Sequence, residues 1–191
     1  MCFDFNPHHD HLFIVGTEEG KIHLCSKAYS GQYLESYDGH FLAVYSVKWN
    51  TYHPNVFLSC SADWTIKMWD SEITRPIITF DLQHAVGDIQ WAPYSSTVFA
   101  AVSSSGHLYV YDLHQEKHTF LCEHPAMKST KALHVSFNPV DPIILVGDDR
   151  GSVYFFKLSQ SLSEGPLQPP VPEKNDKKDP DKDKEPPKTS E

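Results

Sequence analysis

The sequence predicts an all-β fold of about four successive β-propeller blades followed by a disordered tail, and three observations lead to this prediction. A pattern of short strands repeats along the 191 residues with a nearly constant period, as repeat architectures do. Gly, Asn, Asp and Pro bound the strands, and no apolar period of 3.6 residues is long enough to indicate a helix. From residue 160 onward, Pro, Lys and acidic residues leave almost nothing to bury. We therefore expect a folded segment over residues 1–159 and a tail over 160–191.

Each repeat begins with a strand-like stretch that ends in an aromatic residue. These aromatics are Phe5, Trp49, Trp91 and Phe137, which places them 44, 42 and 46 residues apart. A polar loop, an apolar run, a turn and another alternating stretch follow each of them, which is typical of antiparallel hairpins.

The stretch "VGTEEGKIHLC" in the first repeat raises the question of a phosphate-binding loop. Only three residues separate Gly16 from Gly20, Ile22 stands where a hydroxyl residue is needed, and Glu18 and Glu19 would repel an anion. The same place in the other repeats carries "SADW", "SSSG" and "DDRG", so we interpret it as the turn between the second and third strands. Glycine supplies the positive φ of this turn in three repeats: Gly20, Gly106 and Gly151.

A fourth, outer strand is predicted after three of the repeats, in "QYLESYD", "PIITFD" and "HTFLCEH". Four strands in 40 to 45 residues are typical of a propeller blade. No obvious outer strand follows "SVYFFKL" in the fourth repeat. The sequence thus predicts three four-stranded blades and one three-stranded blade, an incomplete propeller whose end strands stay unpaired unless they meet in a small closure.

The second repeat carries the most specific motif, "GH" followed by "SCSADWTIKMWD", which resembles a WD repeat (WD40 type). That resemblance implies a buried hydrogen-bonded set of a His, a strand Ser, a turn Asp and a Trp. By position these residues are His40, Ser59 or Ser61, Asp63 and Trp69. The third repeat has Tyr111 in place of the Trp and no turn Asp, whereas the fourth keeps Asp149 and has Phe156.

Longer strings extend the resemblance to one family. "VGTEEGKIHLCSKAYSGQYLESYDGH", "AVGDIQWAPYSSTVFAAVSSSGHLYVYDL" and "DPIILVGDDRG" resemble the carboxy-terminal repeats of the dynein intermediate chains, most nearly the axonemal outer-arm type. The resemblance covers about residues 2–158. Family members also carry further upstream repeats and an extended amino-terminal region, and this sequence lacks a match to either.

The resemblance implies a non-catalytic scaffold subunit that binds a dynein heavy chain, with other intermediate and light chains as partners. It implies association with microtubules through that complex, a place in the cytoplasm and in the axoneme of the cilium or flagellum, and a role in arm assembly and motility. A cytoplasmic dynein intermediate chain and a general WD-repeat adaptor remain alternatives, as does a hydrolase that uses a propeller face. Which heavy chain would be bound, and by which face, stays open.

Composition limits the kinds of partner and the cysteine chemistry that the chain can have. The formal net charge of −9 disfavours nucleic acid or an anionic membrane as a partner. The sequence shows no secretory signal and no apolar run of the roughly 18 residues that a membrane helix needs. The cysteines lie far apart, without a zinc or disulfide pattern, and we expect reduced thiols: Cys2, Cys25, Cys60 and Cys122.

Neither a cofactor nor a catalytic centre is expected. The cluster "HHDH" (His8, His9, Asp10, His11) contains enough imidazole and carboxylate groups to bind zinc. Adjacent side chains point to opposite sides of the chain, however, so we interpret the cluster as a solvated loop. No G-x-S-x-G or H-E-x-x-H motif occurs. The sequence therefore favours a binding protein over an enzyme.

Trp64 stands at the turn position that glycine occupies in the other three repeats. Its ring can fold back over the neighbouring blade, because large aromatic rings seldom stay bare. The alternative is an anchor for a partner protein, because Trp is enriched among interface hot spots. Both interpretations remain open at this point.

Overall fold

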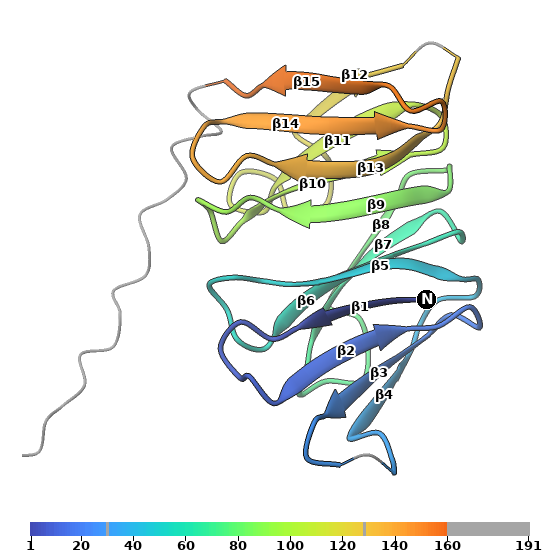
Figure 1. Ribbon diagram of the computed structural model, residues 1–191, viewed down its shortest axis with the longest axis vertical. Helices are drawn as coiled ribbons and strands as arrows, with labels where there is room; N and C mark the ends of the chain where they lie inside the picture. The colour runs from blue at the N-terminus through green and yellow to red at the C-terminus, as the bar shows by residue number, and fades with distance from the viewer. Residues whose placement is uncertain (30, 128, 160–191) are drawn as a thin grey trace, which may run out of the picture.

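The computed structural model describes residues 1–29, 31–127 and 129–159, and these residues form four antiparallel sheets stacked one on the next (Figure 1). All fifteen strands in these ranges belong to the four sheets, and the same ranges contain no helix long and apolar enough to cross a membrane. The all-β prediction is therefore confirmed. The predicted tail lies outside the described residues.

Each sheet is one blade, and its strands follow one another in chain order from the inner to the outer edge. The first blade contains β1 (Cys2–Phe5), β2 (Leu12–Gly16), β3 (Lys21–Ser26) and β4 (Glu35–Asp38). The second contains β5 (Val44–Trp49), β6 (Val56–Ser61), β7 (Thr65–Asp70) and β8 (Ile78–Asp81). The third contains β9 (Val86–Trp91), β10 (Val98–Ser103), β11 (His107–Asp112) and β12 (Cys122–Pro125). The fourth contains β13 (Ala132–Phe137), β14 (Ile143–Asp148) and β15 (Val153–Lys157).

The tight turn between the second and third strands of each blade explains the repeated glycine. Gly20, Gly106 and Gly151 have φ of 87°, 82° and 85°, a region that residues with a Cβ atom avoid. Side chains at the start of the turn also hold it, since Thr17 Oγ1 accepts from the amide of Lys21 at 3.1 Å. The turn chemistry is thus structural, as the sequence indicates.

The hydrophobic core consists of three layers, one between each pair of neighbouring blades. In the first layer, aliphatic side chains of the first blade such as Ile14 and Ile22 meet the aromatic rings of Trp49, Phe57 and Trp69 from the second blade. The second layer repeats this arrangement with Leu58, Cys60 and Ile66 against Trp91, Phe99 and Tyr111. The middle strands β6 and β10 are buried on both faces for this reason.

Hydrogen bonds between blades repeat with the same period as the aromatic residues. Asn6 donates from Nδ2 to the carbonyl oxygen of Pro54 at 2.7 Å, and Asn50 donates to that of Ser96 at 2.9 Å. The Oδ1 atom of each Asn also accepts two amides of its own loop. One side chain therefore fixes both a loop and the next blade. Sequence analysis missed this role, although "FNP" and "WN" at the strand ends carry its signal.

The blades form an open arc. Inner strand β1 lies against β5, β5 against β9, and β9 against β13, while the first and fourth blades lie at opposite ends of the stack (Figure 1). The ends therefore do not meet, and of the two arrangements that the sequence allows, the small closure is wrong. An arc forms because each blade packs only on its neighbours, as in other repeat proteins.

Both end faces of the arc expose apolar residues at positions that are buried between inner blades. On the first blade, Phe5 is 48% exposed where the equivalent Trp49 is 4% exposed. On the fourth blade, Val153 and Phe155 are 65% and 77% exposed, and Ile66, which corresponds to Val153, is fully buried. The ends of the arc are thus uncovered packing surfaces.

These end faces lead us to expect self-association of the chain. Light scattering should give a mass above that of the monomer and rising with concentration, because exposed sheet faces and edges associate. Phe155→Asp should shift the mass towards the monomer, whereas Val140→Asp, at an 84% exposed loop residue, should not. A monomer at every concentration, with the β15 amides protected from hydrogen exchange, contradicts this expectation.

Candidate functional site: the polar network and turn of the second blade

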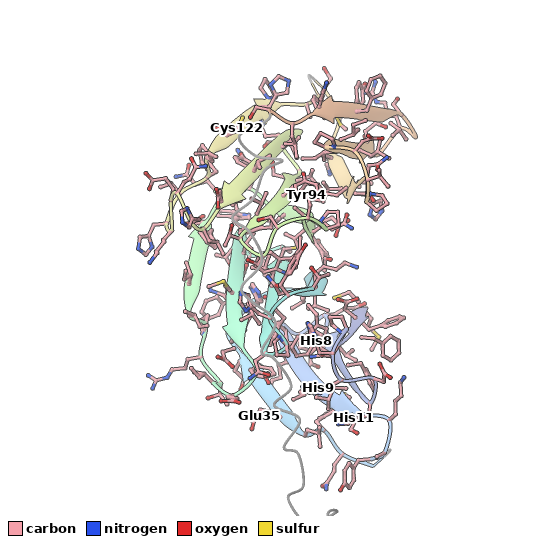
Figure 2. The ribbon with its side chains drawn as sticks, turned by 90° about the vertical axis from the view of Figure 1, so that its left-hand side faces the viewer. His8, His9, His11, Glu35, Tyr94 and Cys122 are labelled. Carbon is pink, nitrogen blue, oxygen red and sulfur yellow. The ribbon has the colours of Figure 1, made fainter. Side chains whose placement is uncertain are left out.

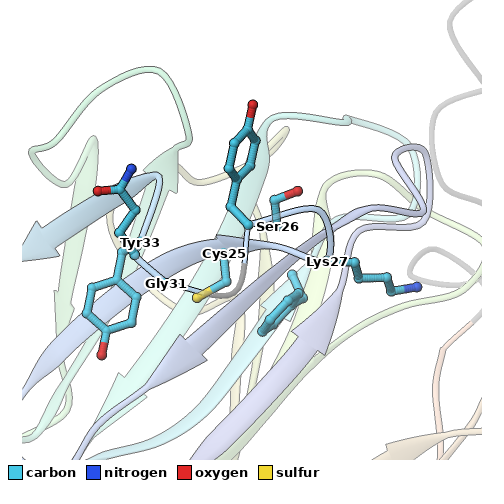
Figure 3. A pocket seen from close by; sticks show the side chains of 8 residues that line it. Cys25, Ser26, Lys27, Gly31 and Tyr33 are labelled. Atoms are coloured by element: carbon cyan, nitrogen blue, oxygen red, sulfur yellow. The ribbon is translucent and has the colours of Figure 1, made fainter.

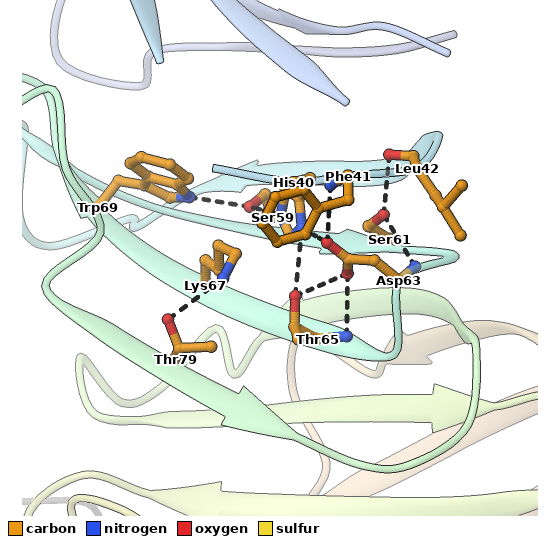
Figure 4. Close-up of polar contacts among 10 residues, drawn as sticks. All are labelled: His40, Phe41, Leu42, Ser59, Ser61, Asp63, Thr65, Lys67, Trp69 and Thr79. Atoms are coloured by element: carbon orange, nitrogen blue, oxygen red, sulfur yellow. Dashed lines mark hydrogen bonds and ion pairs between the residues drawn. The ribbon is translucent and has the colours of Figure 1, made fainter. Parts of the chain in front are cut away.

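A chain of buried hydrogen bonds links the second blade from its third strand to its turn (Figure 4). Trp69 donates from Nε1 to Ser59 Oγ at 2.8 Å, and Ser59 Oγ lies 2.7 Å from His40 Nε2. His40 Nδ1 lies 2.9 Å from Asp63 Oδ2. The structure therefore brings together four of the five residues singled out from the sequence.

The fifth residue, Ser61, has another role in the structure. Its hydroxyl donates to the carbonyl oxygen of Leu42 at 3.0 Å and accepts the amide of Asp63 at 3.1 Å. Of the two candidate serines, Ser59 is thus the one that contacts His40. Ser61 instead holds the loop before β5 to the turn after β6.

When His40 is neutral, every polar proton in this chain of hydrogen bonds has an acceptor. Trp69 donates to Ser59, the Ser59 hydroxyl donates to Nε2, and Nδ1–H donates to the Asp63 carboxylate. Because burial disfavours the charged imidazolium, the pKa of His40 is lowered although Asp63 opposes this shift. A second proton on Nε2 would also point at Ser59, whose own proton would then lose its acceptor.

Asp63 is the residue on which the local polar contacts converge. Thr65 donates its hydroxyl to Oδ1 at 2.7 Å and its amide to the same oxygen at 3.1 Å, and the amide of Phe41 donates to Oδ2 at 3.1 Å. Burial by itself raises the pKa of Asp63, but the hydrogen bonds of Thr65 and His40 hold it below the usual value. One carboxylate thus ties the loop at residues 40–42 to the turn at residues 61–65.

Trp64 follows Asp63 directly and adopts a left-handed backbone conformation. Its φ is 74°, close to the values of the three turn glycines, and 54% of its surface is exposed. Its carbonyl oxygen accepts the amide of Leu82 at 3.0 Å. A residue with a Cβ atom costs about 1 to 2 kcal/mol in this conformation. The second blade therefore holds an exposed indole ring on a strained turn.

The other blades use different polar groups at this turn. In the third blade, Ser103 Oγ lies 2.7 Å from Ser105 Oγ, which lies 3.0 Å from His107 Nδ1. In the fourth blade the residue before the turn glycine is Arg150, so the prediction that Asp149 takes the place of Asp63 is wrong. Two adjacent aspartates caused this error: Asp148 begins the turn and accepts the amides of Arg150 and Ser152.

The histidine cluster after β1 does not converge on one point (Figure 2). His8 Nε2 lies 2.9 Å from the carbonyl oxygen of Thr51 in the second blade, and the rings of His9 and His11 are 6.1 Å apart. Among residues 1–29, 31–127 and 129–159, no three His, Cys, Asp or Glu side chains are placed to hold a metal ion. The four cysteines are free, and Cys122 is exposed.

The largest hollow of those described, about 600 Å³, lies on the uncovered face of the first blade (Figure 3). Phe13, Cys25, Lys27 and Tyr33 are among the residues that line it. By register, Phe13 and Cys25 correspond to Phe57 and Trp69, which are buried against the preceding blade. The hollow is therefore part of an uncovered packing face and carries no arrangement of catalytic groups.

The fold and the network define a class of protein. A family model described as "WD domain, G-beta repeat" matches residues 31–70, which include the whole polar network. The chain thus carries a WD repeat in its second blade, and its four consecutive antiparallel sheets have the arrangement of β-propeller blades.

More specifically, this chain is homologous to the dynein intermediate chains. It is 55% identical over 168 residues to "Dynein intermediate chain 2, ciliary" of Heliocidaris crassispina and 52% identical over 167 residues to "Dynein axonemal intermediate chain 1" of Bos taurus. It is 47% identical over 165 residues to "Dynein, 78 kDa intermediate chain, flagellar outer arm" of Chlamydomonas reinhardtii. The matches cover 86%, 86% and 84% of this chain and 24% of each relative. The chain thus spans about a quarter of the length of these relatives.

Removing the Asp63 carboxylate should destabilise the fold. Asp63→Ala leaves His40 Nδ1 and Thr65 without their acceptor, and an unsatisfied buried donor costs about 1 to 3 kcal/mol. Urea unfolding measures the difference, with Asp10→Ala in an exposed loop as the matched control. An unchanged midpoint in Asp63→Ala would show that the network contributes nothing.

Acid should weaken the fold through His40. Because the pKa of His40 in the folded chain is below its ordinary value of 6.5, the unfolded chain binds the proton first as the pH falls below about 6.5, and stability decreases. Between pH 7 and pH 5 the free energy of unfolding should fall more in the wild type than in His40→Asn. His114→Asn, at an exposed residue, should follow the wild type. Parallel slopes for wild type and His40→Asn rule out this effect.

Proposed function

We propose that this chain is a non-catalytic WD-repeat scaffold subunit of an axonemal outer-arm dynein, which binds the dynein heavy chain and supports arm assembly and motility. The observation that carries the proposal is the homology to proteins named ciliary, axonemal and flagellar outer-arm intermediate chains. It also supports a place in the axoneme of a cilium or flagellum, in contact with the microtubule through the complex and beside other intermediate and light chains.

The structure supports a binding role over chemistry. The titratable groups of His40 and Asp63 are both engaged in the network that fixes the turn of the second blade, so their polarity serves the architecture. A satisfied buried network of this kind makes the blade rigid. His40, Ser59, Asp63 and Trp69 are therefore structural residues, and the partner contact is proposed on the surface that they support.

Trp64 is our candidate for that contact. The turn retains an exposed indole at a position where glycine would relieve the backbone, and strained positions cluster at functional sites. A large aromatic side chain buries much area in an interface at little entropic cost. The strain and the exposure together favour a partner anchor over packing within the chain.

The homology favours the axonemal hypothesis over its alternatives. The three relatives carry ciliary, axonemal or flagellar names, whereas a cytoplasmic dynein subunit or a general WD-repeat adaptor rests only on the repeat itself. Purification of the tagged chain from ciliated cells, with detection of axonemal and cytoplasmic heavy chains, distinguishes the three possibilities.

Trp64→Gly provides the residue-level test. The substitution should leave the fold unchanged or more stable by up to about 1 kcal/mol, because it removes the Cβ atom from a left-handed turn. Binding to a heavy-chain tail should weaken by about 2 kcal/mol or more, as for an interface hot spot. A quantitative pull-down and a thermal melt of the same two proteins measure both quantities.

Phe41→Ala is the matched control, because Phe41 is an aromatic residue that is 87% exposed on the adjoining loop. Loss of binding in Trp64→Gly alone assigns the contact to Trp64. If wild type and Trp64→Gly recover equal amounts of the heavy-chain tail, Trp64 is a packing residue and not a partner contact. If neither protein recovers the tail, the heavy-chain assignment itself is wrong.

A further inference from the structure

The inner strands of the second, third and fourth blades carry a β-bulge at the same place. Pairing shifts between Val44 and Ser46 in β5, opposite Val102 and Ser103 in β9, and between Ala132 and His134 in β13. The extra residues are Tyr45, Gly87 and Leu133. A bulge leaves its extra residue unpaired and redirects the side chain. Tyr45 and Leu133 are accordingly 51% and 37% exposed.

Gly87 leaves a hollow between these two side chains. The hollow has a volume of about 490 Å³ and is lined by Tyr45, Gly87 and Leu133, with Lys131 and His134 at its fourth-blade end. A Cβ atom at Gly87 would come within 2.9 Å of the carbonyl oxygen of Ala132, so the floor is bare backbone. The hollow has room for a large apolar side chain from another molecule.

A second hollow of about 490 Å³ adjoins the first, because Tyr45 lines both. Its other walls include Leu42 and Ala62 from the second blade and Glu18 from the turn of the first blade. Hydrogen bonds fix these walls: the amide of Val44 donates to Thr17 at 3.0 Å. The two hollows lie on either side of Tyr45, and their lining residues together reach from the first blade to the fourth. We refer to the two hollows together as the groove.

The groove is acidic at its first-blade end. Glu18 and Met1 line it and Glu19 follows Glu18 in the same exposed turn, so two carboxylates face one amino-terminal group. The nearby cation Lys21 is paired with Asp38 at 3.6 Å. At the other end, His134 Nδ1 lies 3.6 Å from Asp88 Oδ2, which leaves Lys131 as the cation on the lining. A partner therefore gains most from positive charge placed over Glu18 and Glu19.

The length and direction of the groove favour one secondary structure for a partner segment that binds there. Packed sheets are about 10 Å apart, so the groove spans roughly 30 Å from the first blade to the fourth. A segment along it crosses the strands and cannot pair with their edges, so the backbone groups that it buries must be hydrogen-bonded within the segment. An α-helix does so, and about 20 helical residues span 30 Å.

We propose that this groove binds an amphipathic α-helix of about 20 residues from a partner protein. Its apolar face packs on Tyr45 and Leu133, and basic residues at one of its ends lie over Glu18 and Glu19. This inference rests on the proposed function in that the chain holds a partner protein. The source of the helix is left to the experiment.

The test uses the full chain and two labelled 20-residue helical peptides of equal composition, each with a leucine stripe at helical spacing. One carries its lysines at one end, and the other spreads them evenly. Fluorescence anisotropy should show about tenfold tighter binding of the first peptide at low salt. Tyr45→Ala should weaken it at least tenfold, whereas Tyr29→Ala, at a 60% exposed tyrosine outside the groove, should not. Glu18→Gln with Glu19→Gln should abolish the preference between the peptides.

Equal binding of both peptides, no binding of either, or equal effects of Tyr45→Ala and Tyr29→Ala would overturn the groove proposal. A pull-down of the dynein heavy-chain tail with Tyr45→Ala separates the two proposals. If the tail binds wild type and Tyr45→Ala equally, the scaffold function stands and the groove is wrong. If the peptide binds the groove but no heavy chain is recovered, the groove stands and the heavy-chain assignment is wrong.

Discussion

Face-to-face packing of neighbouring blades is the constraint on which the rest of the structure depends. The first two layers of the core join aliphatic side chains from one blade to aromatic rings from the next, and the third is mostly aliphatic on both sides. A single sheet therefore cannot bury its own apolar faces. The period of the sequence follows from this requirement, because every repeat must present both surfaces. Asn6 and Asn50 reinforce the spacing with hydrogen bonds to the following blade. The exposed rings and aliphatic side chains at the two ends of the arc are the same surfaces without a neighbour.

The polar network of the second blade adds local definition to this packing. Trp69 is both a member of the first core layer and the donor at one end of the hydrogen-bonded chain. At the other end, Asp63 holds the turn that carries Trp64 and the loop that precedes the Tyr45 bulge. Packing thus orients the network, and the network orients the surface to which we assign the partner. The proposed function depends on this rigidity, since the exposed residues are presented by a framework that has little freedom to rearrange.

The repeats were predictable from sequence because aromatic residues and turn glycines recur at fixed spacing, and the outer strands β4, β8 and β12 confirm that part of the prediction. The choice between Ser59 and Ser61 could not be predicted from sequence. Residues two apart on a strand share a face, so the two serines differ only in their position along the strand. The assignment of Asp149 failed since two adjacent aspartates hid the register of the turn. The bulge at Tyr45 left no local signal, because it depends on how β5 pairs with β6. Sequence therefore gives the pattern of strands, while contacts between strands decide the site.

If neighbouring blades stabilise one another, the inner blades, which carry the proposed binding surface, are the most rigid part of the chain. Hydrogen exchange resolved by strand distinguishes these regions, provided that the chain is diluted until light scattering gives the mass of the monomer. The amides of the inner-blade strands should exchange slowest, namely those of β6, β7, β10 and β11. The amides of β1 and β15, at the uncovered ends, should exchange much faster. The turn amides of Asp63 and Thr65 should be protected with the strands that flank them. Uniform protection across the four blades, or slowest exchange in β15, would contradict the account.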